Sequence, residues 1–143
     1  MSKPLYVVAV DGSEWGERAA ARAISLAKKT DAKVKFITVM DWSTLQPMMI
    51  DSAPSPLLDK ETEEKNTIKR VLTPLLEKYH EMDIASDLLW GDPVVVILEQ
   101  LKLSHASMLF VGRKGRSRFV DILLGSVANK LAHRAGVPIV LVP

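Results

Sequence analysis

The chain has 143 residues, 48% hydrophobic and 25% charged, with a formal net charge of +2, and this composition predicts one globular domain over 1–143 rather than a disordered chain. The small net charge gives no reason to expect a nucleic-acid partner, and the absence of cysteine excludes disulfides and thiolate metal sites. No apolar run has the length of a membrane span or a signal peptide, so we expect a soluble, cytoplasmic protein without a membrane partner.

Apolar runs of strand length alternate with helical patterns in the first half of the chain. Strands are predicted over 5–10 and 34–40, and Ser13 is suited to cap the helix between them. An apolar stripe from Ile68 to Tyr79 predicts the second helix, with a kink at Pro74 because proline has no backbone donor. Between these elements, the segment from Asp41 to Leu57 has no periodic pattern. Two interpretations stay open for it, a flexible flap beside a site and a disordered insertion.

The second half continues the alternation. A strand over 84–90 is followed by Asp92 and Pro93, a helix start that favours a helix over 94–98 in spite of its β-branched residues. The fourth strand covers 107–111, and a helix follows over 127–133. The last strand runs from Val137 to Val142 at an edge of the sheet. This order of elements predicts an α/β sandwich with a parallel sheet.

The most informative pattern lies between the fourth strand and the helix after it. The strand ends in Gly112-x-x-Gly115, and nine residues later Gly125-Ser126 opens the helix. Glycine lets backbone amides approach an anion closely, and a helix start offers unpaired N–H groups. The spacing is neither a Rossmann fingerprint nor a Walker A loop. We interpret it as a phosphate cradle, and the alternative is that the glycines serve ordinary turns and a helix start.

Charged residues near this motif favour a nucleotide. Asp11 faces the cradle if the first and fourth strands are neighbours, because open parallel sheets bind ligands beyond the carboxyl ends of their strands. It would then bind a ribose hydroxyl or a metal, unless it only satisfies backbone donors at a helix start. Apart from Phe119 no aromatic residue accompanies the basic residues, so one nucleotide explains them better than nucleic acid. The basic residues are Arg113, Lys114, Arg116 and Arg118.

These motifs resemble the nucleotide-binding branch of the universal stress protein family over essentially the whole chain. The resemblance rests on Val10-Asp11-Gly12-Ser13, Gly91-Asp92-Pro93, Gly112-x2-Gly115-x9-Gly125-Ser126 and the ending 136–142. It implies a single-domain, three-layer α/β/α sandwich of the adenine nucleotide alpha hydrolase-like fold. Its five-stranded parallel sheet would have the order 3-2-1-4-5. It also implies a homodimer in which the last strands, from Val137 to Val142, pair antiparallel.

The resemblance further implies binding of ATP, ADP or AMP, with or without Mg²⁺. Asp11 would contact the ribose–phosphate side, Ala9 would line the pocket, and Val39 would meet adenine through its backbone. Ribose and phosphates would be held by Gly112, Arg113, Gly115, Gly125, Ser126 and Val127. We expect a stress-response regulator and no enzyme, since no histidine lies in a strand-end loop and no convincing general base is present. Slow ATP hydrolysis and a dimeric interaction module with an empty pocket are the alternatives.

Overall fold

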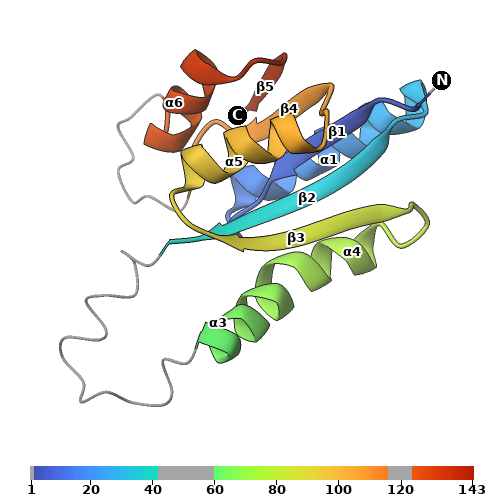
Figure 1. Ribbon diagram of the computed structural model, residues 1–143. Helices are drawn as coiled ribbons and strands as arrows, with labels where there is room; N and C mark the ends of the chain where they lie inside the picture. The colour runs from blue at the N-terminus through green and yellow to red at the C-terminus, as the bar shows by residue number, and fades with distance from the viewer. Residues whose placement is uncertain (1, 42–59, 116–123) are drawn as a thin grey trace, which may run out of the picture.

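The computed structural model describes residues 2–41, 60–115 and 124–143, which form one parallel sheet with helices on both faces (Figure 1). The strand order is β3-β2-β1-β4-β5, which confirms the expected order 3-2-1-4-5. The segment predicted as a flap or insertion lies outside the described residues from 42 onward. The strands are β1 Leu5–Ala9, β2 Lys33–Met40, β3 Ile84–Trp90, β4 Met108–Gly112 and β5 Ile139–Val142.

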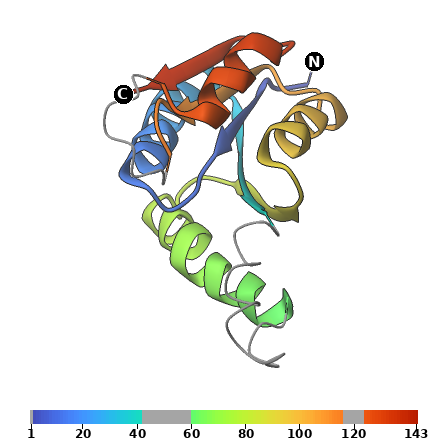
Figure 2. The same ribbon diagram turned by 90° about the vertical axis from the view of Figure 1, so that its left-hand side faces the viewer.

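Helices cover both faces of the sheet, so the three-layer α/β/α architecture is confirmed as well. Figure 1 and Figure 2 show α1 and the helix of α3 and α4 on one face, and α5 and α6 on the other. The helices are α1 Glu14–Thr30, α3 Lys60–Thr67, α4 Thr73–Lys78, α5 Pro93–Leu103 and α6 Ser126–Arg134.

Each face of the sheet has its own apolar core. Successive side chains of β1 point to opposite faces, so Val8 packs under α1 and Val7 packs under α5 and α6. The α1 face that meets the sheet consists largely of alanines, among them Ala19, Ala20 and Ala23, whose side chains are fully buried. Such small side chains let α1 lie close to the carboxyl ends of the central strands.

The β-branched run after β3 is helical, as predicted. The carboxylate of Asp92 accepts a hydrogen bond from the backbone N–H of Val95 at 3.0 Å, and Pro93 occupies the first turn. Val94 and Ile97 are buried while Val95 is exposed, which is the periodicity of a helix packed on one side. The capped start therefore overrides the strand propensity of these residues.

The helix between β2 and β3, for which the sequence predicts a kink at Pro74, is irregular just before that residue. A π-helical turn, Ile68–Leu72, separates α3 from α4 and ends shortly before Pro74. The backbone N–H of Thr73 donates to the carbonyl of Ile68, and Pro74 has no N–H to continue the ladder. Ile68, which belonged to the predicted apolar stripe, is exposed.

The last strand is two residues shorter than predicted. It begins at Ile139 instead of Val137, because Pro138 has no N–H to give to a strand ladder. Its place at the edge is confirmed, since β5 pairs with β4 alone among the described strands.

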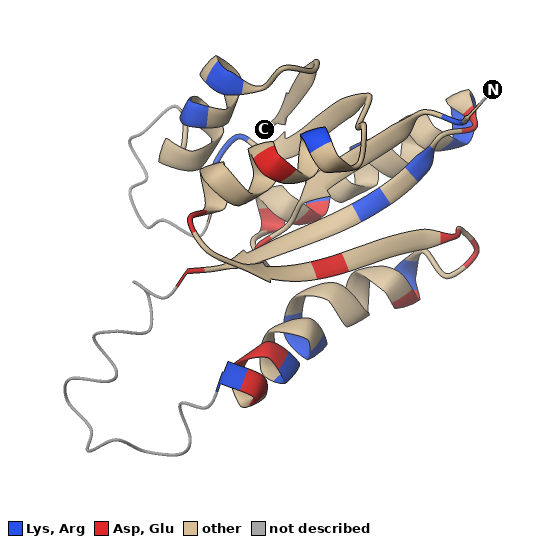
Figure 3. Cartoon of the chain, viewed as in Figure 1, with Lys and Arg blue, Asp and Glu red and all other residues tan. Residues whose placement is uncertain are grey.

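Among the strands, β2 and β3 have charged residues whereas β1, β4 and β5 have none (Figure 3). Lys35 Nζ lies 2.8 Å from Asp87 Oδ2 and joins β2 to the edge strand β3. None of the described helices combines the length and apolar character that a bilayer crossing requires.

Candidate functional site

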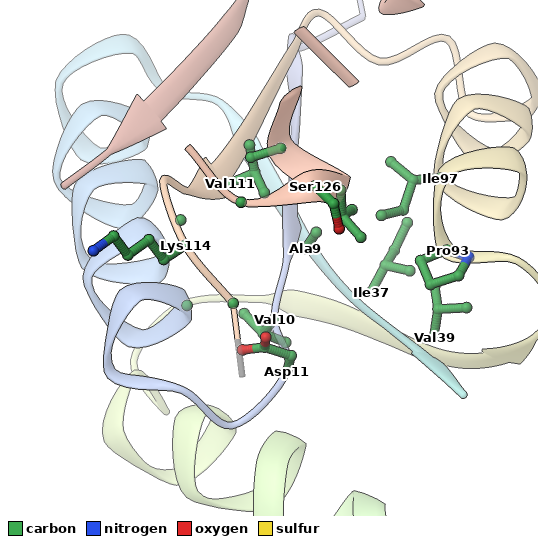
Figure 4. A pocket seen from close by; sticks show the side chains of 16 residues that line it. Ala9, Val10, Asp11, Ile37, Val39, Pro93, Ile97, Val111, Lys114 and Ser126 are labelled. Atoms are coloured by element: carbon green, nitrogen blue, oxygen red, sulfur yellow. The ribbon is translucent and has the colours of Figure 1, made fainter. Parts of the chain in front are cut away.

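The carboxyl ends of β1 and β4 lie side by side because the two strands are neighbours in the sheet, with Ala9 opposite Val111. Asp11 and the glycine motif are therefore brought to the same edge, as the sequence predicts for neighbouring strands. A cavity of about 200 Å³ opens at this edge (Figure 4). Its wall is built by β1, β2, β4, α5, α6 and the turn that follows β4.

Eight of the nine predicted site residues line this cavity. They come from three strands, the glycine turn and the start of α6: Ala9, Asp11, Val39, Gly112, Gly115, Gly125, Ser126 and Val127.

Arg113, the ninth predicted residue, is not among the lining residues. Its N–H donates to the carbonyl of Val142 at 2.7 Å, and its own carbonyl accepts from the N–H of Gly125 at 2.8 Å. Its backbone thus extends the β4–β5 ladder and ties the start of α6 to the end of β4. A nucleotide contact by the Arg113 side chain stays a prediction. Arg116, Arg118 and Phe119 lie outside the described residues.

Asp11 lies against the glycine turn. Its Oδ1 accepts from the backbone N–H of Ser13 at 2.9 Å, so the alternative that Asp11 satisfies a backbone donor is correct for this oxygen. Ser13 is the cap of α1, as predicted, and its hydroxyl accepts from the N–H of Gly16 at 3.1 Å. A Cβ atom on Gly115 would lie 2.9 Å from Asp11 Oδ2. A side chain at 115 would therefore displace the carboxylate.

The first turn of α6 opens into the cavity. Gly125 is the N-cap residue of the helix, with an extended backbone and no side chain that could cap it. The N–H groups of Ser126, Val127 and Ala128 are the first of the helix, so they have no partner within it. The N–H of Gly125 is already bound to Arg113. The turn therefore offers its anion-binding amides from Ser126 onward.

The end of the cavity that lies away from Lys114 and the glycine turn is apolar. Figure 4 shows Ile37, Val39, Pro93 and Ile97 together on the side away from Lys114. Sequence reasoning singled out Val39 but missed the other three residues. Pro93 could have been predicted, because it follows the third strand and the carboxyl ends of parallel strands lie at the same edge of the sheet as Asp11 and the glycine motif.

A family model supplies the decisive comparison. The model of the universal stress protein family matches residues 6–143, nearly the whole chain. The chain belongs to the universal stress protein family.

Individual universal stress and stress response proteins agree with this assignment. The stress response protein NhaX of Bacillus subtilis (strain 168) is 29% identical in an alignment of 162 positions that covers 95% of this chain and 95% of that protein. A universal stress protein solved in complex with cAMP has a TM-score of 0.64 and 23% identity, covering 99% of this chain and 98% of that one. The universal stress protein from Archaeoglobus fulgidus in complex with dAMP has a TM-score of 0.66 and 20% identity, with the same coverage.

In this universal stress protein, the cavity suits a ligand with one apolar and one anionic end. The apolar wall suits the apolar part of a ligand, and the first turn of α6, which begins after Gly125, suits an anion. Within the described ranges, no group of three or more His, Cys, Asp or Glu side chains could hold a metal ion. A cation at this site would therefore depend on the ligand for most of its coordination.

Proposed function

We propose that this universal stress protein binds an adenine nucleotide, ATP, ADP or AMP, at the carboxyl ends of β1 and β4. The observation that carries the proposal is the meeting, in one cavity, of an apolar wall and a helix start whose N-cap residue, Gly125, has no side chain to cap it. The base packs against Ile37 and Val39, the ribose lies beside Asp11, and the phosphates accept from the amides of Ser126 and Val127. The complexes of family members with cAMP and dAMP support an adenine nucleotide.

The proposed role is regulation in a stress response, in the cytoplasm, without efficient turnover. Hydrolysis of a phosphate chain needs an aligned water and a base or a metal. Asp11 is the one carboxylate among the described lining residues, and its Oδ1 already accepts from Ser13. Mg²⁺ would arrive with the phosphates, since it keeps several waters and needs few protein carboxylates. Slow ATP hydrolysis through Asp11 is the second candidate.

We also propose a homodimer through β5. Among the described strands it has one neighbour, β4, and its other edge has ladder donors and acceptors that a second copy can pair. Ile139, Val140 and Leu141 are half-buried in the single chain, which leaves apolar surface for the partner to cover.

Calorimetric titration tests the nucleotide proposal. Purified protein, freed of any nucleotide that co-purifies, should bind at least one of ATP, ADP and AMP with saturation. Gly125→Val should abolish binding while leaving the fold intact. A Cβ there lies 3.4 Å from the carbonyl of Arg113 and 3.6 Å from the N–H nitrogen of Gly115, so the rest of the valine enters the cradle.

Gly136→Val is the matched control, because a Cβ at Gly136 meets no atom within 4 Å. It should bind nucleotide like the wild type. Absence of saturation with all three nucleotides at millimolar concentration would contradict the proposal and favour an interaction module with a vestigial site. Wild-type affinity in a folded Gly125→Val protein would show that the phosphates lie elsewhere.

A further inference from the structure

Lys114 is the cation of the cavity. Among the described lining residues only Asp11 and Lys114 are charged, and they come from the turns that follow β1 and β4. Lys114 precedes Gly115 in the glycine turn, so its backbone is part of the cradle. A phosphate chain in this cavity therefore meets one carboxylate and one ammonium group.

The side chain of Lys114 rests on a tryptophan at the start of α1. Its Nζ lies 6.0 Å from the centroid of the Trp15 ring, and the guanidinium carbon of Arg18 lies 6.0 Å from the same centroid. Figure 4 shows Lys114 extending toward α1 and away from Ser126. Two cations thus share one aromatic ring beside the glycine turn, where Trp15 and Lys114 are both half-buried.

The residues that line the cavity change from apolar at one end to charged at the other, where Lys114 lies. In Figure 4 the apolar wall of Ile37 and Ile97 lies on one side, Ser126 lies in the middle, and Lys114 lies on the far side. A nucleotide with its base on the apolar wall and its first phosphate at Ser126 extends any further phosphates toward Lys114. AMP ends at Ser126, whereas the phosphates of ADP and ATP continue past it.

We propose that Lys114 leaves the Trp15 ring to bind the distal phosphates of a bound nucleotide, and that it thereby sets a preference for ATP and ADP over AMP. The inference rests on the proposed nucleotide site. A charge-assisted hydrogen bond joins two opposite full charges, whereas the aromatic ring offers only its quadrupole, so a distal phosphate attracts the ammonium group more strongly than the ring does. Arg18 stays on the ring and keeps Trp15 in place.

Affinities of three proteins for AMP, ADP and ATP test the inference by calorimetry. Lys114→Met keeps the length of the side chain and removes its charge. Lys130→Met is the matched control, because Lys130 is exposed on α6 and outside the cavity lining. Lys114→Met should lower the affinity for ATP about tenfold, keep that for AMP within about twofold, and weaken the salt dependence of ATP binding. Lys130→Met should leave all three affinities unchanged.

Tryptophan fluorescence gives a second readout. ATP should change the emission of Trp15 because Lys114 leaves its ring, and AMP should not. The change should be absent in Trp15→Phe and in Lys114→Met, and Lys114→Gln replaces the methionine variant if that protein fails to fold.

The outcomes separate the two proposals. If AMP and ATP bind the wild type and Lys114→Met keeps the wild-type ratio of their affinities, the inference about Lys114 is wrong and the nucleotide site stands. If the wild type binds neither nucleotide, both are wrong.

Discussion

Replacing Gly112 by alanine should destabilise the protein, because the end of β4 lies against the first turn of α1. A Cβ atom on Gly112 would lie 2.6 Å from the Cβ of Trp15, 2.8 Å from its carbonyl carbon and 2.9 Å from the carbonyl oxygen of Lys114. All three atoms are fixed by the backbone and none can rotate away. The α1 segment would have to retreat by about 0.8 Å to restore a contact of 3.4 Å.

The size of the effect follows from the rigidity of this contact. Overpacking in a well-packed interior costs about 1–3 kcal/mol of unfolding free energy. We expect about 2–3 kcal/mol for Gly112→Ala, because backbone on both sides must move. At about 4 °C per kcal/mol for a chain of this size, the melting temperature should fall by about 8–12 °C.

Urea unfolding followed by circular dichroism, without nucleotide, measures this loss. Gly136→Ala is the control, since a Cβ there meets nothing within 4 Å, and it should stay within about 0.5 kcal/mol of the wild type. Equal stability of the two variants would refute the packing argument. Gly112 would then be required for another reason, such as the approach of a ligand.

Two further predictions concern titration and turnover. The hydrogen bond from Lys28 Nζ, 3.0 Å from Glu81 Oε1, and the charge of Lys28 lower the pKa of Glu81 below its usual range. Glu81 therefore stabilises the fold at neutral pH, and this contribution is lost as the pH falls through the lowered pKa. Urea unfolding of the wild type and Glu81→Gln should differ at neutral pH and converge in acid. Phosphate release from ATP should be far slower than the roughly 10 s⁻¹ of a typical enzyme. Rapid release that Asp11→Ala abolishes would instead make the protein an enzyme.

The alternation of strands and helices was predictable because central parallel strands are buried on both faces and leave continuous apolar runs. The place of the glycine motif was predictable because the motif directly follows an apolar strand, and its three glycines line the cavity at the carboxyl end of β4. Their role as a phosphate cradle stays a prediction. The boundary of β5 was predicted two residues early, although Pro138 marked the point where the ladder loses a donor. The order of the strands came from the family resemblance, since periodicity alone does not fix which strands are neighbours.

The walls of the cavity were harder to predict. In the sequence Ile37 and Ile97 are indistinguishable from other core residues, and only the placement of β2 beside α5 brings them to one cavity. The two basic residues of the glycine turn were also hard to assign from the sequence. Arg113 and Lys114 are adjacent, but the backbone of Arg113 continues the ladder with Val142, and the next residue lines the cavity. Which of two neighbouring side chains lines a site depends on the path of the backbone.

If two copies pair through the edge of β5 that meets no other described strand, one substitution in β5 should separate them. Val140 is central in Ile139–Val142, and a lysine there would place a charge between two apolar strands. Val140→Lys should therefore shift the protein toward monomer in sedimentation equilibrium at about 20 µM, a range in which a standard interface is fully formed. Val95→Lys is the matched control, because Val95 is 56% exposed on α5, and this variant should stay dimeric. Val140 also packs against the core under α1, so circular dichroism must show that the variant is folded. A wild type that sediments as a monomer at this concentration would rule out the β5 interface.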